Sequence, residues 1–509
     1  MVELITSATT ERTSSENIRA DHDVIIIGAG FGGIGAAIQV KRLGYDNMVI
    51  LEREAGLGGT WYVNRYPGLA VDTPATTYSY WFEPNPHWSR LFPTGDELLQ
   101  YAKDVAEKYD VRRHIRFNTP VDSATWDEDA RVWQVALASG ETLTTRFLIT
   151  ATGFLSQPRT PEIPGIETFV GKVIHSAAWD HSHDFTRRRV ALIGTGASGV
   201  QLIPELAAEV ADLTVFQRTA IHVVPKIDFA FPLWLQKLFV RIPFLHRIFR
   251  QLTDSTFDII LDGALHYRLF RRLAIAASDL SKISRFVAIR DKELRRKLTP
   301  DYDFGCKRPT WSNRYYKSFA QPHVHLETTR IERIEPDAIV TEDGRRTEID
   351  TLVTATGFDV WQANFPAIEI VGRDGRNLGK WWREVGFQSY QGVAIPHFPN
   401  YFSLVSPYGF SSLSFFNTIG YQMLHMERLF GELQRRKATE FEATEEAMTR
   451  FMDNMARRRD KSVWHAGDCT TSRAYYFDPD GKAALLRPTS VLNARRDASR
   501  FSLTDYAMR

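Results

Sequence analysis

The stretch DVIIIGAGFGGIGAAIQVKRLGYDNMVILERE, residues 23–54, decides the fold. Its first apolar run predicts a buried strand, and the glycines Gly28, Gly30 and Gly33 predict a tight turn before a helix. A second strand then ends at Glu52. Such glycines let the backbone approach a pyrophosphate at the positive end of a helix, and the acid accepts hydrogen bonds from a ribose. The stretch therefore predicts a dinucleotide-binding unit; the alternative is a tight turn with no ligand.

A second copy of this pattern, RVALIGTGASGVQLIPELAAEVADLTVFQRT, spans residues 189–219. Its three glycine places are taken by Gly194, Gly196 and Gly199. Glu52 follows the last glycine of its unit by 19 residues, and Arg218 follows Gly199 by the same number. A carboxylate suits a free ribose hydroxyl, whereas an arginine suits a 2′-phosphate. We therefore predict that the first unit binds FAD and that the second binds NADPH.

A further internal repeat indicates how the two units are connected. FLITATGF at 147–154 recurs as TLVTATGF at 351–358, and each predicts a strand that ends in a glycine turn. The first would close the N-terminal half of the FAD domain, and the second would return the chain from the NADPH domain. We predict an α/β fold with two doubly wound Rossmann-like domains and a helical insertion. The predicted segments are a disordered tail at 1–20, an FAD-binding domain at 21–160 and 359–509, an NADPH-binding domain at 161–225 and 305–358, and the insertion at 226–304.

The bulk composition excludes several classes of protein. A net charge of +2 provides no field for nucleic acid, and no apolar run is long enough to span a bilayer. The N-terminal residues contain no apolar signal-peptide core. Cys306 and Cys469 are too few for a disulfide framework or a metal cluster, so we expect a cytoplasmic protein without a metal site. The sequence does not set the oligomeric state, and a monomer is the simplest expectation.

The predicted insertion is rich in Leu, Phe, Ile and Arg at helical spacing. Its segment FPLWLQKLFVRIPFLHRIFRQL, residues 231–252, interleaves bulky apolar residues with four cations: Lys237, Arg241, Arg247 and Arg250. One interpretation is a pair of helices that cover the core, with Pro243 as the break between them. The other interpretation is a collar that contacts a membrane surface or a lipid substrate. The sequence leaves both open.

The segment FVGKVIHSAAWD, residues 169–180, is too polar for a core strand and too broken for an amphipathic helix. Taken alone it is a connector with a turn and packed aromatic residues. Placed just before the second glycine motif, its pattern FxGxxxHxxxW(P/D) resembles that of the type I Baeyer–Villiger monooxygenases. The matching residues are Phe169, Gly171, His175, Trp179 and Asp180. Related flavin monooxygenases that oxidise nitrogen and sulfur usually carry Tyr or Phe where Trp179 stands, so this residue favours the Baeyer–Villiger branch.

The resemblance extends from about residue 21 to at least residue 430 and implies roles for individual residues. GGTWYVNRYPGLAVD at 58–72 resembles the flavin-contacting loop, and FGCKRP at 304–309 resembles the segment with the active-site arginine. The catalytic residues that it implies are Arg308, Asp72 and His175, the last by coupling NADPH binding to domain motion. The residues expected at the two cofactors are Gly28, Gly30, Phe31, Gly33, Glu52, Gly59, Thr60, Trp61, Asp72, Tyr78, Val121, Gly194, Thr195, Gly196, Ser198, Gly199, Arg218, Thr219, Lys307, Arg308 and Trp464.

Other interpretations of these residues remain open at this point. Lys307 and Arg308 could be a surface basic pair, Asp72 could be a helix cap, and His175 could be a packed core histidine. Cys306 has no partner base in its motif, so we interpret it as a packing residue.

One segment departs from the family. SLVSPYGFSSLSFFN at 403–417 has Ser406 and Pro407 where the family usually has Gly-Pro. The substrate-pocket residues near 406–417 therefore stay undefined.

The expected reaction is the insertion of oxygen next to a ketone carbonyl, using NADPH and O2, to give an ester or lactone through a C4a-peroxyflavin. The protein must stabilise the peroxide anion and then the oxyanion of the Criegee adduct, and it must exclude water. Arg308 suits both tasks because arginine stays charged, with Asp72 as its orienting carboxylate. Adjacent side chains of an extended segment point to opposite sides, so Lys307 could reach a 2′-phosphate beside Arg218.

The substrate is less defined than the reaction. The apolar insertion and the aromatic content of 12% favour a lipophilic ketone. One alternative function is oxidation of sulfur or nitrogen in soft nucleophiles, and another is electron transfer by a flavoprotein without oxygenation.

Overall fold

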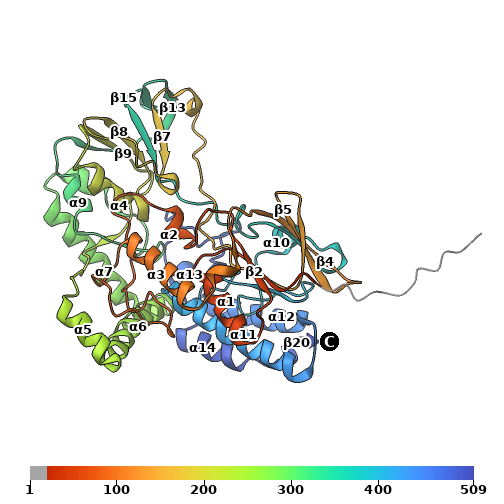
Figure 1. Cartoon of the computed structure of the whole chain (residues 1–509). Coiled ribbons are helices and arrows are strands. Elements are labelled where there is room, and N and C mark those ends of the chain that lie inside the picture. The colour runs from red at the N-terminus through yellow and green to blue at the C-terminus, as the bar shows by residue number, and fades with distance from the viewer. Residues whose placement is uncertain (1–19) are drawn as a thin grey trace, which may run out of the picture.

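The computed structural model describes residues 20–509, in which two sheets lie in separate parts of the molecule with helices around them (Figure 1). Residues 1–19, and with them almost all of the tail predicted at 1–20, lie outside the described residues. The predicted α/β fold class is confirmed. The limits of the individual domains stay predictions.

The first sheet is built around the opening strand. β1 (His22–Ile27) pairs in parallel with β2 (Met48–Leu51) on one side and with β6 (Thr142–Thr150) on the other. α1 (Phe31–Arg42) connects β1 to β2, and its residues from Phe31 to Val40 are all buried. The sheet order is β17-β4-β5-β6-β1-β2-β3, with β18 also beside β6. The other strands are β3 (Ile115–Arg116), β4 (Val121–Asp127), β5 (Val132–Leu137), β17 (Glu369–Val371) and β18 (Tyr401–Ser403).

The second sheet repeats this arrangement with parallel strands throughout. β8 (Arg189–Ile193) and β9 (Asp212–Phe216) are connected by α4 (Ala197–Leu206), as the second glycine motif predicts. The order is β12-β9-β8-β16-β7. The edge strands are β12 (Val324–Glu327) and β7 (Lys172–His175), and β16 (Thr351–Thr354) lies between β8 and β7. A small antiparallel sheet of β13 (Ile331–Glu335), β14 (Ala338–Thr341) and β15 (Arg346–Glu348) lies between β12 and β16 in the chain.

The chain crosses between the two sheets twice, after each copy of the TATGF sequence. The two crossings run side by side, because the Arg159 N–H donates to the Gly357 carbonyl at 2.9 Å and the Asp359 N–H donates to the Gln157 carbonyl at 2.9 Å. After the second crossing, β17 and β18 join the first sheet. The order of strands therefore agrees with an FAD domain that the other nucleotide-binding unit interrupts.

The predicted insertion is helical. Its helices are α5 (Leu233–Arg241), α6 (Pro243–Leu265), α7 (Tyr267–Ala288) and α8 (Lys292–Lys297). Pro243 begins α6, where its missing N–H costs no helical hydrogen bond, so it separates two helices as expected.

The remaining helices and short strands complete the two parts. The helices are α2 (Thr60–Val63), α3 (Gly95–Lys108), α9 (Tyr315–Ser318), α10 (Leu378–Val385), α11 (Phe415–Arg436), α12 (Glu445–Arg459), α13 (Val463–Ala466) and α14 (Val491–Arg500). The short strands are β10 (Val223–Val224), β11 (Thr310–Trp311), β19 (Phe441–Ala443) and β20 (Tyr506–Met508). No helix within residues 20–509 has the length and apolar character needed to cross a membrane.

Candidate active site between two nucleotide-binding motifs

The first glycine turn connects β1 to α1. Gly28 has a φ of +102°, and a Cβ on Gly33 would lie 1.8 Å from the Gly28 carbonyl oxygen, so the third place admits only glycine. A Cβ on Gly30 would meet only the backbone of Gly59, at 3.5 Å or more. Gly30 is also the N-cap of α1. The turn therefore leaves space at the positive end of a helix, which fits the pyrophosphate of FAD.

Glu52 lies at the end of β2 beside this turn, and its side chain is buried. Its Oε2 accepts a hydrogen bond from the Ala29 N–H at 2.6 Å, and its Oε1 accepts one from the Glu54 N–H at 2.9 Å. Burial raises the pKa of Glu52, although these backbone bonds oppose the shift. The Thr119 N–H donates to the Glu52 carbonyl at 2.8 Å, which brings Val121 at the start of β4 close to this end of the sheet. These positions fit the predicted contacts with the ribose and adenine half of FAD.

The predicted flavin loop closes over the first glycine turn. A Cβ on Gly59 would lie 2.9 Å from the Cα of Gly30, and Thr60 then begins α2. The Trp61 Nε1 donates to the Tyr78 hydroxyl at 3.3 Å, and the Tyr78 ring lies edge-on to the rings of Trp61 and Phe31. The structure therefore brings together the aromatic residues that were predicted at the flavin.

The second glycine turn connects β8 to α4. Gly194 has a φ of +111°, and a Cβ on Gly199 would lie 2.3 Å from the Gly194 carbonyl oxygen. A Cβ on Gly196 would have no atom within 4 Å, so this turn also leaves open space in front of a helix. The Thr195 hydroxyl donates to the Thr219 carbonyl at 3.2 Å and ties the turn to the end of β9.

A loop of the first unit contacts α4 of the second. The Tyr66 hydroxyl donates to the Gln201 Oε1 at 2.9 Å, and the Gln201 Nε2 donates to the Ala70 carbonyl at 2.8 Å. Burial raises the pKa of Tyr66 to about 12, and the neighbouring Ser198 hydroxyl lowers it in part. The loop that leads to Asp72 is therefore fixed to the second nucleotide-binding motif.

A cluster of four cations surrounds the end of the second motif: Arg159, Arg218, Lys307 and Arg473. Burial, and after it the charge of Arg218, lowers the pKa of Lys307 to about 8. The pKa of Arg218 is lowered by burial and then by the charges of Arg473 and Arg159. Mutual repulsion of this kind would be relieved by an anion. The cluster therefore fits a 2′-phosphate and supports the assignment of NADPH to this motif.

Arg159 and Arg473 were not predicted. Arg159 lies on the first crossing between the sheets, and Arg473 lies two residues before Tyr475 in the C-terminal segment. No motif or regular spacing in the sequence connects either residue with Arg218, because all three lie on segments that are distant from one another in the chain.

Arg308 and Asp72 form a bidentate ion pair. The Nε and Nη2 of Arg308 lie 2.5 and 2.7 Å from the two carboxylate oxygens of Asp72. Burial lowers the pKa of Arg308, but the carboxylate outweighs this effect and leaves the pKa raised, so the guanidinium stays charged. No helix begins after Asp72, so a helix cap does not explain this residue. The pair therefore forms the arrangement that was predicted for an anion-stabilising arginine.

Three further groups enclose Arg308. The Leu413 carbonyl accepts from its Nη2 at 3.4 Å, which places the divergent 403–417 segment beside the guanidinium. Tyr475 and Tyr476 lie near Arg308, and burial raises the pKa of both, so their hydroxyls are neutral. Trp464 on α13 is buried edge-on to Tyr476. The two tyrosines were missed because they lie in a C-terminal motif, AYYFDPDG, that gives no role to either residue.

Cys306 and Cys469 form a disulfide, with Cα atoms 5.2 Å apart and a sequence separation of 163. The expectation that Cys306 is only a packing residue is therefore wrong. The inference of a reducing compartment from unpaired cysteines loses its basis. The count of two cysteines could not reveal their proximity, because it depends on how the C-terminal segment folds back. The disulfide attaches the segment with Lys307 and Arg308 to the C-terminal segment.

His175 lies at the end of β7, next to the crossing segments. Its Nδ1 accepts from the Ala177 N–H at 3.1 Å, whereas its Nε2 is buried without a hydrogen-bond partner among the described residues. Burial lowers the pKa of His175, so the ring is neutral near pH 7. The position agrees with a role where the two parts meet, and the role itself stays a prediction.

Residues 25–231 match the model of a family described as pyridine nucleotide-disulphide oxidoreductase. A Baeyer–Villiger monooxygenase of Streptomyces coelicolor is 34% identical over 494 residues, which cover 96% of this chain and 93% of the relative.

Two solved structures share the fold over almost their whole length. An oxidised steroid monooxygenase bound to NADP has a TM-score of 0.85 and 28% identity, with 96% of this chain and 99% of that chain covered. The OTEMO complex with FAD and NADP has a TM-score of 0.84 and 28% identity, with 96% and 100% covered. The chain described here belongs to the Baeyer–Villiger monooxygenase family.

Proposed function

We propose that this protein uses FAD, NADPH and O2 to insert an oxygen atom next to the carbonyl of a lipophilic ketone, giving an ester or lactone. One observation carries the proposal: the half-buried bidentate pair of Arg308 and Asp72 lies on segments that also contact the two glycine motifs, of which one is followed by an acid and the other by a cation. The first turn, with Glu52, fits FAD. The second turn, with the cluster of Arg218 and Lys307, fits NADPH. The solved relatives that hold these nucleotides support the same assignment.

The bound nucleotides would supply the hydride and the flavin-activated oxygen. The protein supplies charge and orientation. The Arg308 guanidinium stabilises negative charge on oxygen in the transition state, and it does so without giving up a proton. Asp72 holds the guanidinium in one orientation through two parallel hydrogen bonds.

Water exclusion is the second task of the site. The rings of Tyr475 and Tyr476 are apolar surfaces near Arg308, Trp464 packs edge-on against Tyr476, and together these rings would keep water from the reacting oxygen. The Leu413 carbonyl brings the 403–417 segment to the same place, so we assign the wall of the ketone pocket to this segment.

We also propose that the enzyme acts in the cytoplasm as a monomer. The supporting argument is its need for NADPH, which cells hold in their interior.

A panel of ketones tests the proposal. Purified enzyme with bound FAD is given cyclic, linear and aromatic ketones, and NADPH, oxygen and ester are measured together. We expect one NADPH and one oxygen consumed for each ester formed. A sulfide and a tertiary amine are included as competing substrates. The proposal fails if only these soft nucleophiles are oxidised, or if NADPH is consumed with no oxygenated product from any compound.

A further inference from the structure

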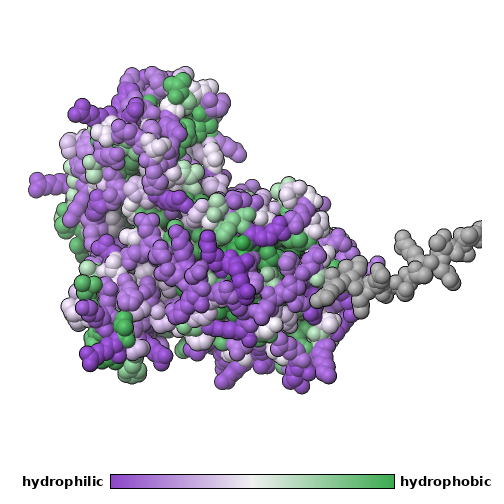
Figure 2. Space-filling view, in the orientation of Figure 1, coloured by the Kyte–Doolittle hydropathy of each residue, from purple (hydrophilic) through white to green (hydrophobic). Residues whose placement is uncertain are grey.

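Exposed hydrophobic side chains are concentrated in the helical insertion. Of the 23 large hydrophobic side chains that are exposed within residues 20–509, 18 lie between Ile227 and Val287. On the face that Figure 2 shows, hydrophobic surface gathers at the lower left, over α5 and α6. Trp234 on α5 and Phe244 on α6 are each 66% exposed. A soluble monomer seldom exposes so many large apolar side chains together, so this surface needs a partner.

The exposed side chains follow the helices in stripes. On α7 the stripe consists of Leu269, Leu273, Leu280, Ile283 and Val287. On α6 it consists of Phe244, Ile248, Leu252 and Ile259. Their spacings of three, four and seven residues place each set along one side of its helix.

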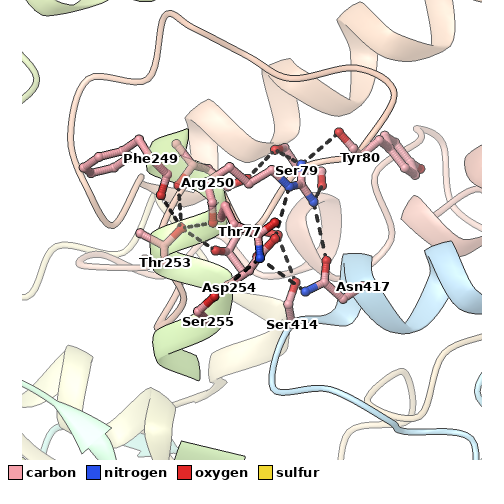
Figure 3. A network of polar contacts seen from close by, with 12 residues as sticks. Thr77, Ser79, Tyr80, Phe249, Arg250, Thr253, Asp254, Ser255, Ser414 and Asn417 are labelled. Carbon is pink, nitrogen blue, oxygen red and sulfur yellow. Dashed lines mark hydrogen bonds and ion pairs between the residues drawn. The ribbon is translucent and has the colours of Figure 1, made fainter. Parts of the chain in front are cut away.

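The inner side of α6 combines buried apolar residues, Phe257, Leu261 and Leu265, with a network of polar contacts. Arg250 donates to the Ser79 and Tyr80 carbonyls at 3.1 and 3.2 Å, and it forms an ion pair with Asp254 at 3.4 Å (Figure 3). The Thr253 hydroxyl accepts from the Thr77 hydroxyl at 2.8 Å. Buried apolar and polar groups therefore both attach α6 to the protein, and a second set of apolar side chains still faces outward.

The exposed charges on these helices are almost all positive. Those on α5, α6 and α7 are Lys237, Arg241, Arg247, Arg268, Arg271, Arg272 and Lys282, against one exposed acid, Asp279. Asp279 is neutralised by Lys282 at 2.9 Å. The three acids of α6 are half-buried, and burial raises the pKa of Asp258 to about 7 with help from the charge of Asp254. The surface combines apolar stripes with unpaired positive charge.

A second copy of the chain is a poor occupant for this surface. A two-fold contact places the same patch on both partners, so the cations of one copy would face the cations of the other. Apolar stripes bordered by Lys and Arg, with aromatic residues such as Trp234, are instead typical of helices that lie in a membrane interface. Anionic headgroups supply the charge that the surface lacks.

We propose that the outer faces of α5, α6 and α7 form a docking surface for an anionic lipid bilayer. We further infer that the enzyme takes its ketone from that bilayer, and this second part rests on the proposed function. The Ser414 hydroxyl donates to the Thr77 carbonyl at 3.0 Å, and the Leu413 carbonyl next to it contacts Arg308. The polar network on the inner side of α6 therefore reaches the proposed wall of the ketone pocket (Figure 3).

Vesicle co-sedimentation of the full-length holoenzyme tests the proposal. We expect binding to vesicles of phosphatidylglycerol and phosphatidylcholine that is at least tenfold tighter than binding to pure phosphatidylcholine and that weakens at high salt. Trp234→Ser with Phe244→Ser, and separately Lys237→Glu with Arg241→Glu, should each lower the affinity for anionic vesicles at least about tenfold.

The matched control reverses two exposed cations of α10, Lys380→Glu with Arg383→Glu, on the opposite side of the molecule in Figure 1. This variant should bind vesicles like the parent. Flavin absorbance and ester formation from a water-soluble ketone should be unchanged in all variants, which shows that they fold.

Three results would overturn the docking surface. These are absence of vesicle binding by the parent, equal binding by the α5–α6 variants, and a parent dimer that the Trp234→Ser, Phe244→Ser variant converts to a monomer. If vesicle binding is found but no ketone yields an ester, the proposed function fails and the docking surface stands.

Discussion

The two glycine turns have the same backbone conformation and differ in the charged residue that follows, Glu52 in the first unit and Arg218 in the second. A Cβ would lie 1.8 Å from the Gly28 carbonyl oxygen if added to Gly33, and 2.3 Å from the Gly194 carbonyl oxygen if added to Gly199. In both turns the first glycine packs against an alanine of a TATGF sequence, Ala151 in one and Ala355 in the other. The internal repeat seen in the sequence is therefore a repeat of the same contact.

Beyond this shared frame, the two sites hold their charges differently. Glu52 is buried and accepts two backbone hydrogen bonds, so its position is fixed before any ribose arrives. Arg218 lies among other cations that repel it and has no fixed partner of this kind within residues 20–509. We propose that the glycine backbone admits a dinucleotide and that the charged side chain at the end of the second strand, Glu52 or Arg218, selects which dinucleotide binds.

Substituting the middle glycine of each turn gives the largest expected effect. Gly30→Val and Gly196→Val each place a side chain in space that the protein leaves open. A bound pyrophosphate would occupy that space, so the side chain would clash with it. We expect Gly30→Val to be purified without yellow flavin and to have no activity. Gly196→Val should keep its flavin and lose about 100-fold in apparent NADPH affinity, the equivalent of about 3 kcal/mol of phosphate hydrogen bonds. Full flavin absorbance in Gly30→Val would remove the assignment of FAD to the first turn.

The next prediction separates the reaction centre from both turns. Arg308→Ala should lower the rate of ester formation by about 100- to 1000-fold, because one anion-stabilising donor is typically worth that much. Flavin reduction by NADPH should continue, because hydride transfer depends on the orientation of the nicotinamide. Stopped-flow absorbance follows the reduction, and product analysis follows the ester.

Two companion variants serve as controls for Arg308. Arg308→Lys should restore little activity, because an ammonium lacks the planar fork that binds Asp72. Asp72→Ala should have a milder effect, because the guanidinium stays charged but loses its fixed orientation. Ester formation by Arg308→Ala at the parent rate would contradict the catalytic assignment.

Much of this comparison could be predicted from the sequence. The glycine spacing and the 19-residue interval to Glu52 and Arg218 are local signals, because a βαβ unit lies within one continuous segment. The pairing of Arg308 with Asp72 is predicted only through the family resemblance, because the two residues have a sequence separation of 236.

Other parts of the site were missed for a related reason. Arg159, Arg473 and the disulfide each depend on segments that meet only when the two crossings and the C-terminal segment are in place. Neither spacing nor composition reports such contacts, because both describe the chain only over short distances.

The charge cluster at the second turn should produce a pH dependence. Lys307 has a pKa of about 8, so it is protonated below that pH and can pair with a 2′-phosphate. Above pH 8 the free enzyme loses this charge, and the KM for NADPH should rise by up to about tenfold between pH 7 and 9. The KM for NADH should stay constant.

Lys307→Arg is the control for this pH dependence. Arginine keeps its charge throughout the range, so the KM for NADPH should be low and independent of pH in this variant. The same rise in KM with pH in Lys307→Arg would show that another group is responsible.

A smaller effect is expected from removing the disulfide of Cys306 and Cys469. The disulfide of Cys306 and Cys469 joins the segment of the second site to the C-terminal segment, so Cys306→Ser with Cys469→Ser should lower the stability by about 2–4 kcal/mol. Thermal unfolding with and without reductant measures this loss. If thiol titration of the denatured, unreduced protein finds two free thiols, the bond does not form in solution.

Coenzyme selectivity in flavin reduction tests the difference between the two turns most directly. The kcat/KM for reduction is measured with NADPH and with NADH, in the parent and in Arg218→Ala. We predict a decrease of about 10- to 100-fold with NADPH, since a hydrogen bond to a charged phosphate contributes about 1.5–3 kcal/mol. The value with NADH should change by less than about twofold. An equal loss with both coenzymes would contradict the claim that the charge beyond the second turn selects its nucleotide.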